Sequence, residues 1–231
     1  MKKYNLAIVS ALALLLVFFV GCDENEADFL DSSNIVAGEE PPGDCEIGHR
    51  TQTPGGWGAP AAGNNTGYLR DTYFDEVFPN GLTVGCGGGF TINLTSAAAV
   101  EAFLPSGGKS TSLDQDWVDP TSKDLKNTLA GHLVALTLNN HFDHYLEDFG
   151  DVVYLLCDLV LCSGEFAGKS VQQVVNQTNK ILGGCASNLT IKEAVDIVSN
   201  INENFIDGQI DNGYLCCPKG TTGTLDNNVA D

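Results

Sequence analysis

Basic residues are scarce in this sequence. Its 231 residues include 11 Lys and Arg against 30 Asp and Glu, which gives a formal net charge of −19 at pH 7. Nucleic acids and anionic lipid surfaces are themselves negative, so this balance opposes binding to either. The excess of acidic residues is compatible with binding divalent cations, or it contributes to solubility alone. We therefore predict no nucleic-acid partner.

The motifs of several common enzyme classes are also missing. The glycine-rich segment at residues 86–89 lacks the lysine and the spacing of a phosphate-binding loop. The chain has no G-x-S-x-G nucleophile motif and no H-E-x-x-H zinc motif. Catalytic groups can nevertheless assemble from distant residues. We interpret the protein as a binding or structural module rather than an enzyme, with an extracellular hydrolase or metal-dependent enzyme as the alternative.

Long hydrophobic runs are limited to one, at residues 6–20, which follows Lys2 and Lys3. The run is shorter than the roughly 20 residues of a spanning helix, but it is typical of a signal peptide. It ends in F-V-G-C, which resembles the lipobox of bacterial lipoproteins, with Phe19 in place of the usual leucine. We predict a signal peptide at residues 1–21 and a lipid anchor, with palmitate-type acyl chains, on Cys22. An ordinary signal peptide is the alternative.

The segment at residues 22–46 is rich in Asp and Glu and has no basic residue. Such a composition predicts a disordered tether. Acidic residues at this place also resemble the export signal of Bacteroidota lipoproteins, which implies the outer membrane and the cell surface. A solvated spacer without an address is the alternative, so whether the domain faces the periplasm or the exterior stays open.

The 8 cysteines leave an odd number once Cys22 carries lipid, so at least one sulfur should lie outside a disulfide. An extracytoplasmic protein can keep disulfides, whereas the cysteine spacing lacks the paired C-x2-C of a zinc site. We favour disulfides over metal, with the connectivity open, among Cys45, Cys86, Cys157, Cys162, Cys185, Cys216 and Cys217.

The rest of the chain predicts one compact α+β domain, predominantly α-helical, at residues 47–213. Its centre is the segment at residues 122–142, where apolar residues recur nearly all round a helix, so neighbouring elements should bury it. Gly131 weakens this helix and indicates the close approach of another backbone. Asn139 lies near the helix end, where Asp should be tolerated far better than at Leu133.

Other elements surround this central helix. Two amphipathic helices are predicted near the C-terminus, at residues 171–182 and 191–205, and each starts with a capping box. The remaining segments are strands at 82–85 and 90–94, which predict a small β-hairpin, a helix at 96–104, a strand or helical turn at 151–162, and a flexible tail at 214–231.

Aromatic residues near the start of the domain are the candidates for binding. Trp57 lies among Gly and Pro, which favour turns over a regular helix. Its indole either stacks on a sugar ring or folds back as the plug of its loop. Tyr68 and Tyr73 belong to a segment that is short and irregular or helical. Trp57, Tyr68 and Tyr73 are the candidate contacts for a glycan, a matrix component or an envelope protein.

Metal ligands are few. His141 and His144 stand three residues apart, so both could face one zinc ion from a helix, or else cap the helix C-terminus. Asp114, Asp116 and Asp119 offer the oxygen ligands that calcium prefers, without the glycine and terminal glutamate of an EF-hand. A solvated loop is the alternative there. We expect no cofactor, with calcium or zinc as the alternative.

Six segments carry a distinctive combined pattern: RTQTPGGWG, NGLTVGC, LTSAAAVEAFLPSGG, LAGHLVALTLN, FAGKSVQQVVNQTNKILGGC and SNINENFIDG. Together they resemble an uncharacterised domain that recurs in secreted and surface proteins of Bacteroidota. The resemblance covers about residues 47–208 and implies an envelope location. It implies no catalytic residues.

Overall fold

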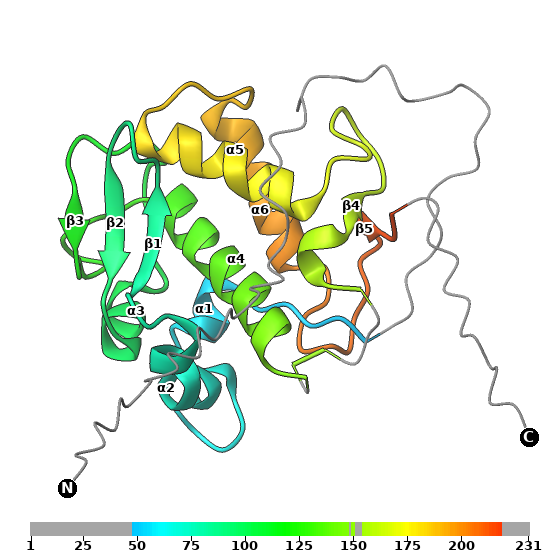
Figure 1. Ribbon diagram of the computed structural model, residues 1–231, viewed down its shortest axis with the longest axis horizontal. Coiled ribbons are helices and arrows are strands. Elements are labelled where there is room, and N and C mark those ends of the chain that lie inside the picture. Colours follow the sequence, from blue (N-terminus) through cyan, green and yellow to red (C-terminus); the bar gives the residue numbers. More distant parts are fainter. Residues whose placement is uncertain (1–47, 148, 151–153, 219–231) are drawn as a thin grey trace, which may run out of the picture.

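The computed structural model describes residues 48–147, 149–150 and 154–218 (Figure 1). The predicted signal peptide, the lipid anchor at Cys22 and the acidic tether lie outside these residues. The described part is an α+β fold made mainly of helices, with two small sheets, as the sequence predicts. Among its helices, none combines the length and the apolar character that crossing a membrane requires.

The centre of the fold is helix α4 (Thr128–Tyr145), which crosses the middle of the view in Figure 1. It starts later than residue 122 because Asn127 caps it, its Oδ1 accepting from the Ala130 backbone N–H at 3.3 Å. Most of its side chains are buried, which confirms the predicted central position. Gly131 permits a close contact, since a Cβ there would lie 2.7 Å from the Ser106 carbonyl oxygen.

Helices α5 (Val171–Gly183) and α6 (Ile191–Asn202) pack against α4 and against each other. Both predicted capping boxes are present, Ser170 with Gln173 and Thr190 with Glu193. Helix α6 ends earlier than the predicted residue 205. The apolar residues of the predicted helix nevertheless extend beyond α6, since Phe205 lies in the core although it is not helical.

A three-stranded sheet lies beside α4 and α5. Strands β1 (Leu82–Gly85) and β2 (Thr91–Leu94) form the predicted antiparallel hairpin. Strand β3 (Trp117–Val118) pairs in parallel with β2 and was not predicted, because two residues carry no periodicity. Helix α3 (Ala97–Phe103) follows β2 after an N-cap at Ser96.

The remaining elements correct three predictions. Helix α1 (Pro54–Trp57) forms one turn where a turn without helix was expected, because Thr53 caps it and Pro54 suits its first position. The ambiguous segment before residue 162 contains both a 3₁₀ turn, η1 (Leu156–Asp158), and strand β4 (Val160–Leu161). Strand β5 (Leu215–Cys216) pairs with β4, so the expected loose tail begins too early.

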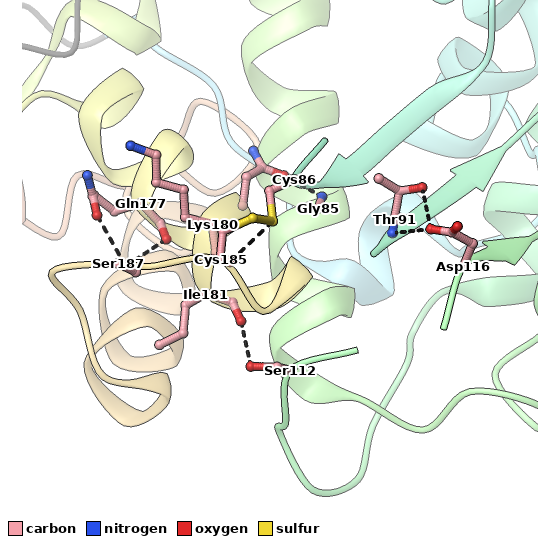
Figure 2. The surroundings of a disulfide bond; sticks show 11 residues. Gly85, Cys86, Thr91, Ser112, Asp116, Gln177, Lys180, Ile181, Cys185 and Ser187 are labelled. Carbon is pink, nitrogen blue, oxygen red and sulfur yellow. Dashed lines mark hydrogen bonds between the residues drawn. A yellow bond between two sulfur atoms is a disulfide. The ribbon is translucent and has the colours of Figure 1, made fainter. Parts of the chain in front are cut away.

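Disulfides cross-link the outer elements. Cys86, in the loop between β1 and β2, bonds to Cys185 just beyond α5, as Figure 2 shows. Cys162 bonds to Cys216 beside the β4–β5 pair. Cys157 and Cys217 are disulfide-bonded as well, so every cysteine in the described ranges belongs to a disulfide. This agrees with the preference for disulfides over metal.

Candidate functional site

The first candidate contact, Trp57, lies in the core. Its side chain is 0% exposed and packs against Phe142 and Phe149, with ring centroids 4.8 and 5.9 Å away. Its Nε1–H donates to Asn139 Oδ1 at 2.9 Å. A sugar ring could not reach this indole without opening the fold. The stacking interpretation of Trp57 is therefore wrong, and the alternative, a plug that closes its loop, is confirmed.

Asn139 is the centre of a buried hydrogen-bond network. Its Oδ1 also accepts from the Gln52 backbone N–H at 2.9 Å. Its Nδ2 donates to the Gln52 carbonyl at 3.0 Å and to Asn202 Oδ1 at 2.9 Å. The amide of Asn202 continues the network to the His132 carbonyl at 2.9 Å. Three of the segments in the combined pattern, around Trp57, Asn139 and Asn202, thus meet at one structural node.

A second buried group, Arg70 on helix α2 (Thr66–Val77), holds the loop after α1 in place. Its guanidinium donates to the carbonyls of Trp57 at 2.5 Å and Ala59 at 3.2 Å. It also forms ion pairs with Asp71 and Glu101. All of these partners belong to the protein, so the cation fixes the N-terminal loop, α2 and α3 to one another.

The two tyrosine candidates lie on α2. Unlike Trp57, neither of them is fully buried. Asn65 caps this helix by accepting from the Tyr68 backbone N–H at 2.9 Å. Tyr68 is 45% exposed, and Tyr73 is half-buried against the core. The exposed side of the helix also carries Asp75 and Glu76. The segment is fully helical, which settles the open choice between irregular and helical structure.

The C-terminal end of α4 adjoins this side of α2. Tyr145 is 44% exposed, and its hydroxyl donates to Glu76 Oε2 at 2.5 Å. That hydrogen bond is the main reason why the pKa of Tyr145 is raised above 10, with a smaller contribution from Tyr73. One turn earlier, the His141 ring packs on Phe78 at 4.8 Å. We call the surface formed by Tyr73, Glu76, His141 and Tyr145 the α2/α4 face.

The predicted zinc ligands, His141 and His144, are neighbours at the end of α4. Burial lowers the pKa of His141, and the nearby His144 lowers it further. Both side chains sit on the last turns of α4, as the three-residue spacing predicts. Within the part of the chain that the structure covers, no group of three or more His, Cys, Asp or Glu side chains is placed to hold a metal ion.

The predicted calcium ligands have a structural role. Asp116 Oδ1 accepts from the Thr91 backbone N–H at 2.8 Å, a bond visible in Figure 2. Asp119 Oδ1 accepts from the Thr95 backbone N–H at 2.7 Å. These carboxylates extend the short β2–β3 ladder beyond its two paired residues, and Asp114, exposed, takes no part in it. This structural role gives the two carboxylates a reason apart from calcium, which stays a prediction.

One carboxylate that the sequence did not single out is Asp143 on α4. Its Oδ2 accepts from the Leu156 backbone N–H at 2.7 Å and so positions η1. Burial raises its pKa from 3.8 to about 6, and the negative Asp158 adds to the rise. The Leu156 bond and His144 act in the opposite direction. The helical spacing of Asp143 from the histidines was visible, but its burial by η1 was not.

Comparisons with known proteins add no relative. No family model matches the chain, and searches of curated proteins and of solved structures found no match.

Proposed function

We propose that this protein is a lipid-anchored protein of the outer membrane whose domain acts as a binding module at the cell surface. Cys22 carries the lipid, and residues 22–46 carry the domain away from the membrane. The observation that carries the binding role is the α2/α4 face. The exposed ring of Tyr145 and the half-buried ring of Tyr73 lie there with the carboxylate of Glu76, on two helices that the core holds in fixed positions.

The position of this face supports the proposal. In Figure 1 the chain after Gly48 runs in light blue from the side of β4 and β5, whereas α2 lies at the opposite, lower side. Hydrogen bonds tie the first described residues to the segment after α6, including Thr51 N–H to the Phe205 carbonyl at 2.9 Å. The first described residues are therefore fixed at the side of the domain away from α2.

The combined sequence pattern is consistent with this reading. We propose that the chain shares its domain with the surface proteins of Bacteroidota that the pattern resembles. The meeting of three pattern segments at Asn139 supports this, because it gives their combination a single physical reason. The pattern then marks the scaffold, and the contact surface is free to differ between proteins.

The anchor is tested by Cys22→Ala. We expect this change to abolish metabolic labelling with palmitate and to move the protein from the membrane fraction to the soluble fraction. Protease treatment of intact cells then reports whether the unaltered protein faces the exterior. Retention of the Cys22→Ala protein in membranes washed with high salt would contradict the lipid anchor.

The binding role is tested with the released Cys22→Ala protein on isolated cell-envelope material. We expect binding that Glu76→Gln combined with Tyr145→Ala reduces at least tenfold. Phe90→Ala is the matched control, because it removes an aromatic ring that is 38% exposed on the β1–β2 loop. Equal losses for both variants, at unchanged melting temperature, would remove the α2/α4 face from the proposal.

A further inference from the structure

We propose that the α2/α4 face binds a cationic group, the ammonium or guanidinium of a basic segment in a partner protein. This rests on the proposed binding role and names the chemistry of the partner.

The geometry joins two pairs of side chains. Tyr73 and Glu76 stand three residues apart on α2, and His141 and Tyr145 stand four apart on α4, so each pair shares one side of its helix. The Tyr145 hydroxyl, at 2.5 Å from Glu76 Oε2, links the two pairs. Glu76 therefore lies among aromatic rings.

This combination suits a cation for two reasons. The face of an aromatic ring attracts a positive charge, and tyrosine is among the better rings for this contact. A carboxylate offers about four acceptor positions, of which the Tyr145 hydroxyl takes one, so Glu76 keeps acceptors for an ammonium or guanidinium.

The charges on α2 and α4 also favour a cationic partner. The other acidic residues of α2 are Asp71 and Asp75, both exposed, and its one basic residue, Arg70, is buried and bonded to Asp71 and Glu101. Helix α4 contains no Lys or Arg. Neither helix presents a lysine or arginine at its surface that would compete with the partner, and an anionic glycan would be repelled.

The experiment uses the full Cys22→Ala chain and a fluorescein-labelled pentalysine peptide, followed by fluorescence anisotropy. We expect binding that weakens as salt increases. Glu76→Gln, which keeps the shape of the side chain, should raise the Kd about tenfold. Tyr145→Ala should raise it about threefold to fivefold, whereas Tyr145→Phe, which keeps the ring, should stay within about twofold.

Glu165→Gln is the matched control, because it removes the same charge from an exposed position between β4 and α5. It should leave the Kd unchanged. Equal effects of Glu165→Gln and Glu76→Gln would mean general attraction by the net charge, and the inference would be overturned. Binding of a neutral oligosaccharide but not of pentalysine would also overturn it, yet would leave the binding role intact. Failure to bind any envelope material would instead remove the proposed function itself.

Discussion

The centre and the edge of this domain are held together in different ways. At the centre, the side chains of Trp57, Asn139 and Asn202, together with the backbone of Gln52, join α1, α4 and α6 through hydrogen bonds in a site closed to water. At the edge, the end of α5 is joined to the β1–β2 loop by the Cys86–Cys185 disulfide. The first region depends on matched polar groups, and the second on a covalent bond.

The surroundings explain the difference. A buried amide without partners is costly, so all of the bonding positions of Asn139 are used by neighbouring segments. The β1–β2 loop is exposed and rich in glycine, which favours its unfolded state. Backbone contacts such as Phe90 N–H to the Gly183 carbonyl, at 2.9 Å, are open to competition from water there. A disulfide resists that competition.

The largest effect is expected when the central node is broken. Asn139→Asp keeps the volume but removes the donors to Gln52 and Asn202 and buries a negative charge. We expect the free energy of unfolding to fall by about 3–5 kcal/mol. Urea denaturation followed by circular dichroism measures it. Asn64→Asp, at an exposed loop position, is the control and should change stability by less than about 0.5 kcal/mol.

An intermediate effect is expected at the edge. Replacing Cys86 and Cys185 together with Ser should lower the free energy of unfolding by about 2–4 kcal/mol, since the bond closes a sequence separation of 99 residues. The same denaturation experiment measures this loss. A loss below about 1 kcal/mol would show that the backbone contacts of this loop suffice, and the contrast between the two regions would then fail.

The smallest effect is expected at Asp143. Its side chain is half-buried, less enclosed than Asn139 and less exposed than the β1–β2 loop. Its folded pKa of about 6 exceeds the ordinary 3.8, so the folded state binds the proton more tightly. The stability that this group contributes is therefore fully present below pH 3.8 and is lost as the pH rises through 6. A pKa shift of this size corresponds to a change of about 3 kcal/mol in the free energy of unfolding. Because solvent screens this half-buried group, we expect a change of about 1–2 kcal/mol.

Asp143→Asn tests this directly. We expect the variant to be more stable than the unaltered protein above pH 7 and to lose that advantage near pH 4. Thermal unfolding across this range measures the difference. An advantage of the variant that is constant with pH would mean that Asp143 does not titrate in this window.

The sequence predicts the parts of the fold that rest on local signals. Capping boxes and apolar stripes located α5 and α6, an apolar surface nearly all round the helix located α4, and the β1–β2 hairpin was placed correctly. The position of Gly131 in a buried helix also predicted the close backbone contact that Ser106 makes. Strand β3 and β5 escaped prediction, because pairing with distant strands, and not their own composition, makes them strands.

The candidate site depends on contacts between distant segments, which single residues do not reveal. Asn139 was expected to tolerate Asp because of its place near a helix end, but residues 52, 57 and 202 converge on it. Trp57 was a candidate contact with a buried plug as the alternative, and the sequence alone could not show that Gly58 lets the chain approach the Leu104 carbonyl closely. Tyr68 and Tyr73 remain candidates, and Tyr145 joins them only through its hydrogen bond to Glu76.

The burial of Trp57 also gives the domain an optical reporter of its own state. The chain has 2 tryptophans, and Trp57 is sealed beneath aromatic rings, whereas Trp117 is half-exposed at the sheet. An indole kept from water emits at shorter wavelength and resists collisional quenchers such as acrylamide. The emission of this protein should therefore contain a blue, quencher-resistant component from Trp57. Loss of this component while the circular dichroism of the helices persists would signal that the core opens before the helices unwind.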